Sequence, residues 1–334
     1  MSVEQTRRLT IRDVAKKAGV STATVSNALN DVRGVGADVR ERVLAAAREL
    51  GYRPNVAAQA TRTGRTRQMA FITPDLTNPF YPRLARAVAN AARAAGYALL
   101  LVDTQDGEAE LACIEQIARH DVDGILWCPA TGEDVLARNR LGAPVVVIDD
   151  NHIGRDSIAA NYRMSSALVA GHVAACGYKR IGMLSGPLSI FAAKLRRAEF
   201  IASLAQGEEV VWEVFQPFHQ DLNEAAREAI LRNEVDVIVC CDDVMAAACI
   251  QLALDHGLSV PGDVAVIGHD DMPIATLIRP KLTTVRQPLD AIGSEAVRMM
   301  IERIEEPQRA NRSTAIDVEL IVRGSSFPGD QRPA

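Results

Sequence analysis

Between Leu9 and Asn30, apolar residues recur at the three- and four-residue spacing of short helices, and a glycine separates two such patterns. Thr10 is placed to cap the first helix, and Asp13, three residues later, can reach back to it as in a capping box. Gly19 supplies the positive φ at which that helix can end, and Ser21 can cap the next one. The stretch therefore predicts two short helices joined by a tight turn.

The offsets within this stretch are those of a helix-turn-helix. Ala15 is the small residue beneath the crossing, Gly19 is the turn glycine and Val25 is the apolar anchor. This geometry leaves the start of the second helix free to enter the major groove of DNA. An ordinary helical hairpin is the alternative on these offsets alone.

A third amphipathic helix is predicted from Gly36 to Leu50, with Gly36 at the capping position and Gly51 at the end. Its predicted buried face consists of Val39, Val43, Leu44, Ala47 and Leu50. Three short helices within about fifty residues make a compact DNA-binding head.

From Gln68 onward, short apolar runs alternate with longer helical patterns. The predicted strands are residues 69–73, 97–103, 124–128, 144–150, 180–185, 210–215, 235–240 and 264–268. The predicted helices are residues 84–95, 111–120, 165–176, 192–205, 223–232, 244–256 and 291–304. This alternation is typical of parallel βαβ units, and the units are too many for one small sheet. We expect an α/β body of two doubly wound lobes, with ligands beyond the carboxyl ends of the strands.

Charge is distributed unevenly along the 334 residues, although the net charge is only −5. Residues 1–67 carry 13 lysines and arginines against 6 aspartates and glutamates, whereas the rest of the chain carries 24 against 36. A basic head on an acidic body indicates a nucleic-acid-binding module joined to another function. No signal peptide or apolar run of membrane-spanning length is visible, so we expect a cytoplasmic, nucleoid-associated protein without membrane contact.

Metal-binding and catalytic signatures are missing from the sequence. The six cysteines form no Cys-x-x-Cys pair and lie in apolar surroundings, which favours free, buried thiols. The six histidines show no metal spacing, and there is no nucleophile elbow, Walker loop or Gly-x-Gly-x-x-Gly. Pairs of aspartates could suggest an acid/base enzyme, but aspartates at strand ends commonly cap helices or bind ligands. We expect no enzyme, no cofactor and no metal site.

Ordered segments in both parts of the chain match one known family. In the head they are Thr10–Ala15, Ala18–Ser21, Thr24–Asn30 and Arg48–Asn55. In the body they are Val122–Ile125, Gly177–Ile181, Val260–Gly268 and Leu282–Pro288. Over nearly its whole length the chain resembles the LacI/GalR family of bacterial transcription repressors. The resemblance implies a periplasmic-binding-protein-like effector domain joined to the DNA-binding head by a hinge helix, in a homodimer that reads a pseudo-palindromic operator.

The resemblance also implies domain boundaries. They are a helix-turn-helix head at 1–53, a hinge helix and linker at 54–67, and a ligand-binding domain at 68–330. Lobe 1 would take residues 68–160 and 288–317, and lobe 2 residues 161–287 and 318–330. The sequence ends without leucine heptads, so we expect dimers without the tetramerising helix of some family members.

By resemblance, Thr22, Ala23 and Asn27 occupy the base-reading positions of the recognition helix. An asparagine can make a bidentate contact with adenine, and the methyl groups of alanine and threonine can meet thymine. The other predicted DNA contacts are Thr10, Ser21, Thr24, Asn55, Gln59, Thr61 and Arg62. Thr10, Ser21 and Thr24 suit phosphate contacts, although helix capping alone is an alternative for the first two.

The hinge departs from the family pattern. Family hinges usually read Ala-Arg-Ser-Leu, and the leucine wedges into the minor groove. Here the same place reads Ala58-Gln59-Ala60-Thr61. Threonine is a poor wedge because it is small and polar. We therefore expect shallower operator bending, or a different central step, with Gln59 and Arg62 carrying more of the contact.

The resemblance places a ligand cleft among the loops that follow the strands. The predicted ligand-binding residues are Phe80, Tyr81, Asp149, Arg196, Phe218, Asp242 and Asp270. Aromatic faces can stack on a sugar or a base, with packing in the lobe core as the alternative, and carboxylates with a guanidinium can bind vicinal hydroxyls. Asp242 replaces the usual family asparagine, which favours a hydroxyl-rich or amine-bearing ligand over a carboxylate. Asn161 replaces a frequent aspartate and partly offsets this.

We therefore expect a ligand-regulated, sequence-specific DNA-binding repressor with a sugar or polyol effector between two lobes. A purine or another non-sugar metabolite is the alternative effector. A small-molecule binding protein without DNA function is a more distant alternative. The expected partners are double-stranded operator DNA, the effector and a second copy of the chain. Ligand would act by shifting populations between two lobe arrangements.

Overall fold

The computed structural model describes residues 9–29, 34–52, 64–104, 107–119, 122–129, 142–150 and 154–327. The chain forms two compact units, Met1–Thr66 and Arg67–Ala334. In the described residues of the first unit, the helices are α1 (Ile11–Ala18), α2 (Thr22–Leu29) and α3 (Ala37–Leu50). Val14, Val25 and Val43 supply one buried side chain each to their common core. The predicted three-helix head is confirmed.

Local signals set the ends of these helices as the sequence predicts. The Asp13 carboxylate accepts hydrogen bonds from the backbone N–H and the hydroxyl of Thr10, each 2.8 Å long. Ser21 Oγ accepts from the N–H of Thr24 at 3.0 Å, which caps α2. Gly19 adopts a φ of 68° at the end of α1, a left-handed conformation that glycine adopts without steric penalty.

The predicted buried face of α3 was wrong at one position. Leu44 is 37% exposed, whereas Ala46 is only 5% exposed and packs in the core. A helical period of 3.6 residues places positions 43, 46, 47 and 50 in one stripe, and position 44 lies about 100° away from position 43. The leucine at position 44 therefore faces outward although its type favours burial.

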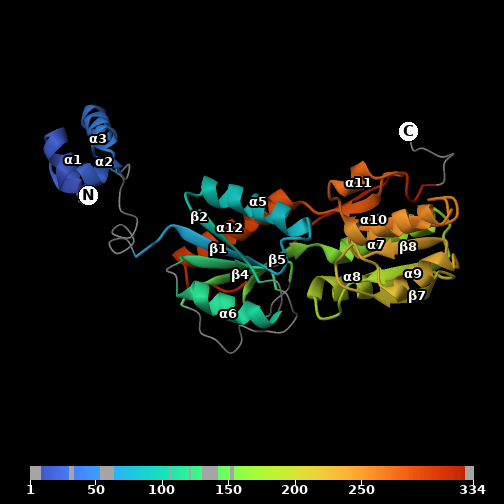
Figure 1. Cartoon of the computed structure of the whole chain (residues 1–334). Helices are drawn as coiled ribbons and strands as arrows, with labels where there is room; N and C mark the ends of the chain where they lie inside the picture. The colour runs from blue at the N-terminus through green and yellow to red at the C-terminus, as the bar shows by residue number, and fades with distance from the viewer. Residues whose placement is uncertain are drawn as a thin grey trace, which may run out of the picture. The chain divides into compact units, whose positions relative to one another are not determined.

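Lobe 1 of the second unit is built on a six-stranded parallel sheet in the order β11-β5-β4-β3-β1-β2. Its strands are β1 (Gln68–Thr73), β2 (Ala98–Asp103), β3 (Gly124–Trp127), β4 (Val145–Ile148), β5 (Asp156–Ala160) and β11 (Ser313–Ile316). Helices α5 (Phe80–Ala94) and α12 (Leu289–Glu305) cover one face, and α6 (Gly107–Ala118) covers the other (Figure 1). Both faces of the central strands β1, β3 and β4 are buried, which explains their continuous apolar runs.

Alternation along β1 shows how the layers form. Met69 and Phe71 pack toward α5 and α12, whereas Ala70 and Ile72 pack toward α6. Helices α5 and α12 approach each other closely at Gly293, where an added Cβ would lie 2.8 Å from backbone atoms of α5. Only a residue without a side chain fits there, so this glycine sets the distance between the two helices.

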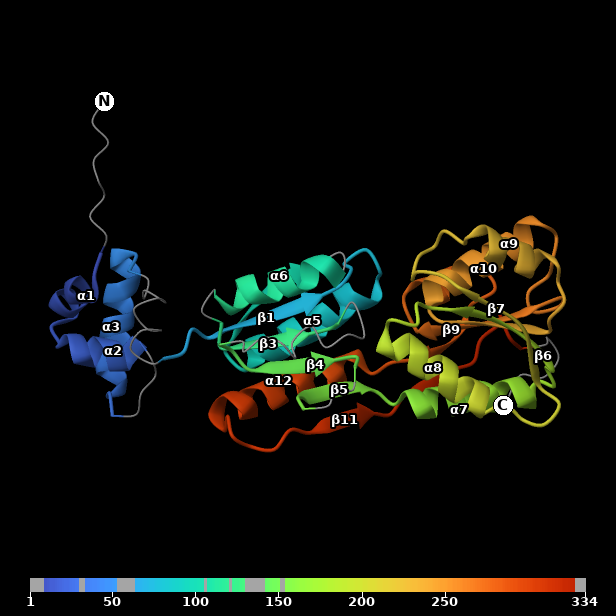
Figure 2. The ribbon, with the colours of Figure 1, turned by 90° about the horizontal axis from the view of Figure 1, so that it is seen from below.

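Lobe 2 is built on a second six-stranded sheet in the order β12-β10-β9-β8-β6-β7, in which only β12 runs antiparallel. Its strands are β6 (Arg180–Ser185), β7 (Glu209–Phe215), β8 (Val237–Cys240), β9 (Ala265–Asp270), β10 (Thr283–Arg286) and β12 (Glu319–Ile321). Helices α7 (Tyr162–Ala175) and α8 (Phe191–Ala202) lie on one face (Figure 2). The other face carries α9 (Glu224–Leu231), α10 (Asp243–Asp255) and α11 (Ile274–Leu277). The predicted α/β fold class is confirmed.

The chain passes between the two sheets along three segments, which join β5 to α7, β10 to α12 and β11 to β12. Each lobe is therefore built from segments that lie far apart in the sequence. The carboxyl ends of β4 in lobe 1 and of β8 and β9 in lobe 2 are followed by residues that line the same cavity. This is where ligands bind in doubly wound folds.

All six cysteines are free, but only Cys128, Cys240 and Cys249 are buried, whereas Cys113, Cys176 and Cys241 are partly exposed. The expectation of buried thiols is therefore wrong for the second three. Within the described ranges, no helix is long and apolar enough to cross a membrane.

Candidate functional site

All seven residues predicted to bind a ligand line one cavity between the two lobes. Lobe 1 contributes Phe80, Tyr81 and Asp149, and lobe 2 contributes Arg196, Phe218, Asp242 and Asp270. The cavity has a volume of about 20 Å³, which is room for little more than one water molecule. The structure thus brings the predicted residues together around a nearly closed space.

Asp149 and Asp270 stand where β4 and β9 end, and both have positive φ angles, 69° and 104°. Aspartate tolerates such backbone angles better than most residues because its short side chain can form local hydrogen bonds. The hydroxyl of Tyr162 donates to the Asp149 carboxylate. Gln287 Nε2 donates to Asp270 Oδ1 at 2.7 Å. Backbone geometry and these donors together aim the two carboxylates at the cavity.

Asp242 follows β8 and caps α10. Its Oδ1 accepts a hydrogen bond from the N–H of Met245 at 2.7 Å, in the manner of an N-cap aspartate. Its Oδ2 is buried and has no hydrogen-bond partner among the described residues. One oxygen therefore holds the helix, and the other is left for a group that enters the cavity.

Arg196 extends from α8 and is the cation of the cavity. Its guanidinium lies 5.4 Å from the ring centre of Tyr162, and its Nη1 lies 3.8 Å from Asp270 Oδ1. Its Nη2 donates to Cys241 Sγ at 3.5 Å, and its buried Nε has no partner in the described part of the chain. The arginine is held in place by stacking and a thiol, so its remaining donor capacity is available.

Aromatic rings from both lobes line the cavity. Phe80 and Tyr81 lie in the first turn of α5, and the two rings pack edge to face with centres 5.2 Å apart. Both rings belong to the hydrophobic core, so core packing and cavity lining coexist. Phe218 packs against Gly186, where an added Cβ would lie 2.6 Å from the ring. These rings offer apolar surface to whatever occupies the cavity.

Four further lining residues were not predicted: Asn78, Ile190, Ala192 and Gln287. Asn78 Oδ1 accepts the N–H of Phe80 at 3.0 Å and so shapes the start of α5. Gln287 follows β10 and belongs to the matched segment that ends at Pro288, so its position after a strand was a signal that could have found it. Ile190 and Ala192 gave no such signal because apolar residues are common at helix starts.

Electrostatics in the cavity are set by burial. Burial raises the pKa of Asp149 to about 7, which Arg196 opposes and Asp270 reinforces. Burial likewise raises the pKa of Asp242 to about 7 and raises the pKa of Asp270. Burial opposes the charge on Arg196, but the surrounding acidic groups outweigh it and raise the pKa of Arg196. At neutral pH the cavity contains a charged guanidinium beside the carboxyl groups of Asp149 and Asp242, which are each protonated in part of the molecules.

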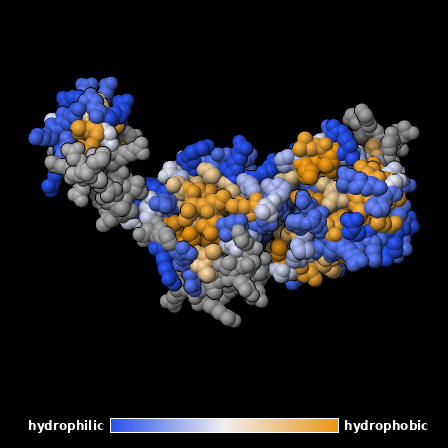
Figure 3. Space-filling view, viewed as in Figure 1, coloured by the Kyte–Doolittle hydropathy of each residue, from blue (hydrophilic) through white to orange (hydrophobic). Residues whose placement is uncertain are grey.

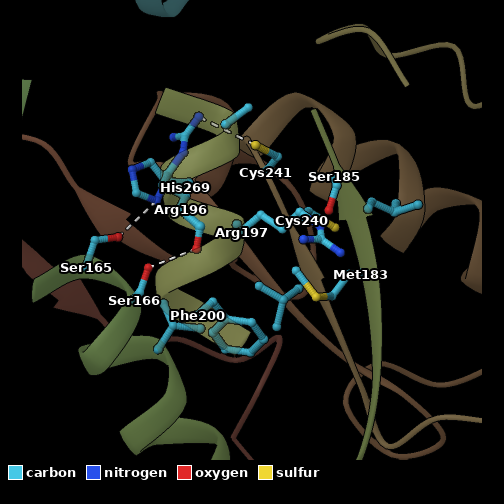
Figure 4. Close-up of a pocket in the computed structure, with 15 residues that line it drawn as sticks. Ser165, Ser166, Met183, Ser185, Arg196, Arg197, Phe200, Cys240, Cys241 and His269 are labelled. Carbon is cyan, nitrogen blue, oxygen red and sulfur yellow. Dashed lines mark hydrogen bonds between the residues drawn. The ribbon is translucent and has the colours of Figure 1, made fainter. Parts of the chain in front are cut away.

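A second cavity of about 50 Å³ lies within lobe 2, and Arg196 lines both cavities (Figure 4). Ser165 Oγ lies 3.4 Å from His269 Nδ1, and the Ser166 hydroxyl donates to the backbone oxygen of Arg196 at 3.1 Å. Burial lowers the pKa of His269 well below its ordinary value, so its ring is neutral. This space suits a few water molecules and is too small for a sugar ring.

The exposed face of α2 carries the predicted base-reading residues. Thr22, Ala23 and Asn27 are all exposed, whereas Val25 and Ala28 on the opposite face are buried. The predicted phosphate-binding residues Thr10 and Ser21 are exposed caps of α1 and α2, and Thr24 is half-buried beside Ser21. The remaining predicted DNA contacts, Asn55, Gln59, Thr61 and Arg62, lie outside the described residues.

Family models match both units of the chain. Residues 10–55 match bacterial regulatory proteins of the lacI family, and residues 170–326 match a periplasmic binding protein-like domain. A transcriptional regulator MalR from Streptomyces coelicolor is 33% identical over 96% of this chain and 98% of its own length. A transcriptional repressor PurR from Haemophilus influenzae is 31% identical over 95% of this chain and 98% of its own length.

Solved structures show the same fold. The transcriptional regulator CelR in complex with cellobiose has a TM-score of 0.72 at 27% identity and covers 95% of this chain and 100% of its own. The lac repressor dimer bound to operator and the anti-inducer ONPF has a TM-score of 0.85 at 24% identity, covering 96% of this chain and 100% of its own. The chain belongs to the lacI family of bacterial regulatory proteins, which are ligand-responsive DNA-binding transcriptional regulators and not enzymes.

Proposed function

We propose that this regulator is a repressor whose affinity for a pseudo-palindromic operator is set by a sugar or polyol bound between its lobes. The observation that carries the proposal is the cavity, where three carboxylates surround the guanidinium of Arg196 beside aromatic rings. Carboxylates accept hydrogen bonds from vicinal hydroxyls, a guanidinium donates to ligand oxygens, and rings stack on the apolar face of a sugar. The cellobiose complex of a structural relative supports this ligand class.

Opening of the lobes is part of the proposed mechanism. A sugar ring does not fit a cavity of about 20 Å³, so ligand enters an open form and is enclosed when the lobes close. The three segments that join the sheets are the positions where such a movement can occur. Ligand shifts the population of lobe arrangements, and the head responds through the hinge. Whether ligand releases DNA or promotes its binding depends on which arrangement it prefers.

In this proposal, residues 1–53 read the operator, residues 54–67 form the hinge helix and linker, and residues 68–330 bind the effector. Thr22, Ala23 and Asn27 contact base edges because they are exposed on the face of α2 opposite its core. Thr61 replaces the usual hinge leucine and bends the operator less. A kink in the bound operator as sharp as a hinge leucine produces would contradict the proposed shallower bend.

A homodimer is also part of the proposal. Leu100 and Leu101 are exposed on the edge strand β2, and Leu277 of α11 is 75% exposed. Figure 3 shows hydrophobic surface over β2 and α5 and again at α11. Contiguous exposed apolar surface is typical of protein interfaces. The fold similarity to the lac repressor dimer supports the same assembly.

A purine or another non-sugar metabolite is the second candidate effector. The rings of Phe80, Tyr81 and Phe218 favour it because aromatic faces can stack on a base. The 31% identity to a PurR repressor points in the same direction. The carboxylates and Arg196 can form hydrogen bonds with the hydroxyls of a ribose or with the ring nitrogens of a base equally well.

The test is a thermal-shift screen of the full chain with sugars, polyols, sugar acids and purines, followed by operator binding with each ligand that stabilises the protein. The operator is first selected from random DNA with the same protein. We expect a sugar or polyol to stabilise the chain and to change operator affinity. Stabilising ligands that all leave operator affinity unchanged would show that the lobes and the head are not coupled.

A further inference from the structure

Charge in the effector cavity is unbalanced. Among the described residues that line it, Arg196 is the sole cation, and the acidic groups are Asp149, Asp242 and Asp270. Arg196 approaches Asp270 only to 3.8 Å and donates its hydrogen bond to Cys241 instead of to a carboxylate. A buried carboxylate without a nearby cation costs free energy. A fully ionised cavity would therefore lack two positive charges.

Two buried hydrogen-bond acceptors in the same cavity have no donor within the described part of the chain. Asp242 is 3% exposed, and its Oδ2 is unpartnered. Gln287 is 5% exposed. Its Nε2 donates to Asp270, and its Oε1 is unpartnered. The occupant of the cavity must therefore donate hydrogen bonds at these two atoms, since buried polar atoms are rarely left without partners.

The chemistry of the missing group follows from these two deficits. A hydroxyl could satisfy an acceptor but would bring no charge. A metal ion would bring charge, yet in the described ranges no three histidine, cysteine or acidic side chains are grouped to hold one. An ammonium group brings one positive charge and three donors, and charge-assisted hydrogen bonds of this kind are the stronger ones.

We propose that the effector is an amine-bearing polyol, such as an amino sugar, whose ammonium group binds Asp242 while its hydroxyls bind Asp149, Asp270 and Arg196. The inference rests on the proposed effector function of this cavity and narrows its ligand class. Asp242 is then the residue that determines specificity, because its Oδ2 is free while its Oδ1 is fixed by α10. The remaining carboxylates disfavour sugar acids.

The proton content of the cavity agrees with this assignment. Burial raises the pKa of Asp242 to about 7, with Asp270 reinforcing and Arg196 opposing the shift. Near neutral pH and without ligand, this carboxyl group is therefore protonated in part of the molecules. An ammonium ion replaces that proton, so its binding releases protons to the buffer.

Calorimetric titration of the full chain with matched ligands tests the proposal. The probes are D-glucose, D-glucosamine and N-acetyl-D-glucosamine, and cellobiose with the β-1,4-linked glucosamine disaccharide and its N-acetylated form. We expect at least one amine to bind about tenfold or more tightly than both its hydroxyl and its N-acetyl counterpart. Titrations in two buffers of different ionisation enthalpy should show proton release on amine binding.

The variant Asp242→Asn keeps an N-cap oxygen for α10 but removes the charge. We expect this variant to bind the amine and its neutral counterparts with about equal affinity, and its thermal unfolding to stay cooperative. Glu228→Gln, the same chemical change on an exposed residue of α9 away from the cavity, should keep the full preference.

Three results would overturn the amine assignment: equal or tighter binding of the neutral sugars by the natural chain, an unchanged preference in Asp242→Asn, or no binding of any probe amine. Operator affinity, measured on the same samples, tests the proposed function separately. An amine that binds with the expected preference yet leaves operator affinity unchanged would support the amine-bearing ligand class. It would refute the coupling between the cavity and operator binding.

Discussion

At the scale of single residues, the cavity is built from aspartates that each have a second, structural task. Asp149 and Asp270 adopt positive φ angles at strand ends, and Asp242 caps a helix. These tasks fix the side chains before any ligand arrives, because the backbone or one carboxylate oxygen is already held. A ligand then meets acceptors whose conformational freedom has been lost during folding, which favours affinity.

We predict that Asp242→Asn changes the pH dependence of stability. The pKa of Asp242 is raised to about 7 in the folded chain, above its ordinary value near 4 in the unfolded chain. Its contribution to stability is therefore complete below about pH 4 and is lost as the pH rises to about 7. Between pH 4.5 and pH 8, the free energy of unfolding of the variant should therefore rise by roughly 1–3 kcal/mol relative to that of the natural chain.

Urea unfolding of both proteins at several pH values measures this difference without ligand. Asp149, Asp270, Arg196 and the buried Tyr81 face the same cavity and are present in both proteins, so the two proteins differ only at position 242. A difference that does not change with pH would show that the carboxyl group of Asp242 has an ordinary pKa.

A second prediction at this scale concerns Asn27 on the exposed face of α2. Asn27→Ala should weaken binding to the selected operator by roughly 1–3 kcal/mol and relax the base preference at one position in each half-site. Thermal stability should not change, because the side chain is exposed. Binding to random DNA is the control: an equal loss there would mean that Asn27 contacts phosphate.

At the scale of elements, helices and strands with continuous apolar patterns were predictable from the sequence, and polar elements were not. Strand β5 reads Asp-Ser-Ile-Ala-Ala and β11 reads Ser-Thr-Ala-Ile, so neither shows an apolar run or a clear alternation. They become strands because each pairs with a neighbour far away in sequence. Tertiary pairing decides such segments, and local pattern cannot reveal it.

The same limit applies to the candidate site. The strand-end aspartates and Arg196 could be found from position and family pattern. The hydrogen bond from Gln287 to Asp270 and the unpartnered Oδ2 of Asp242 could not, because both depend on which atoms meet when the strands and helices of lobe 2 pack together. Sequence reveals which residues can reach a site, and packing decides which of their atoms remain unsatisfied.

A matched pair of glycine variants tests the close packing of α5 and α12. Gly293→Ala should destabilise the chain by about 1–3 kcal/mol, because the new Cβ would meet the backbone of α5 at 2.8 Å. Gly171→Ala, at an exposed site of α7 with nothing within 4 Å, should stabilise by about 0.5–1 kcal/mol. Urea unfolding of the two variants measures both. Similar changes in the free energy of unfolding of the two variants would show that α5 moves away from the new Cβ at little cost.

At the scale of the whole molecule, the proposed dimer depends on apolar surface at two places on the second unit. Leu101 in β2 and Leu277 in α11 are both exposed. The double variant Leu101→Asp, Leu277→Asp should sediment with half the mass of the natural chain and lose most of its operator affinity, since one head contacts only one half-site. Leu231→Asp, at the end of α9, introduces the same charge elsewhere and should remain dimeric. A double variant that still sediments as a dimer would place the interface on another surface.

The interleaving of the two lobes has a consequence for how the chain is made. Strand β11 pairs with β5 at Ser313 and Ser157, so lobe 1 lacks an edge strand and helix α12 until most of lobe 2 has been translated. On the ribosome, β5 is an open edge with an uncovered apolar face for well over a hundred residues of synthesis. Lobe 1 begins first, yet it is completed only after all of lobe 2 except strand β12 has been translated. A ribosome that stalls anywhere before residue 313 releases a chain whose lobe 1 cannot close, however complete lobe 2 has become.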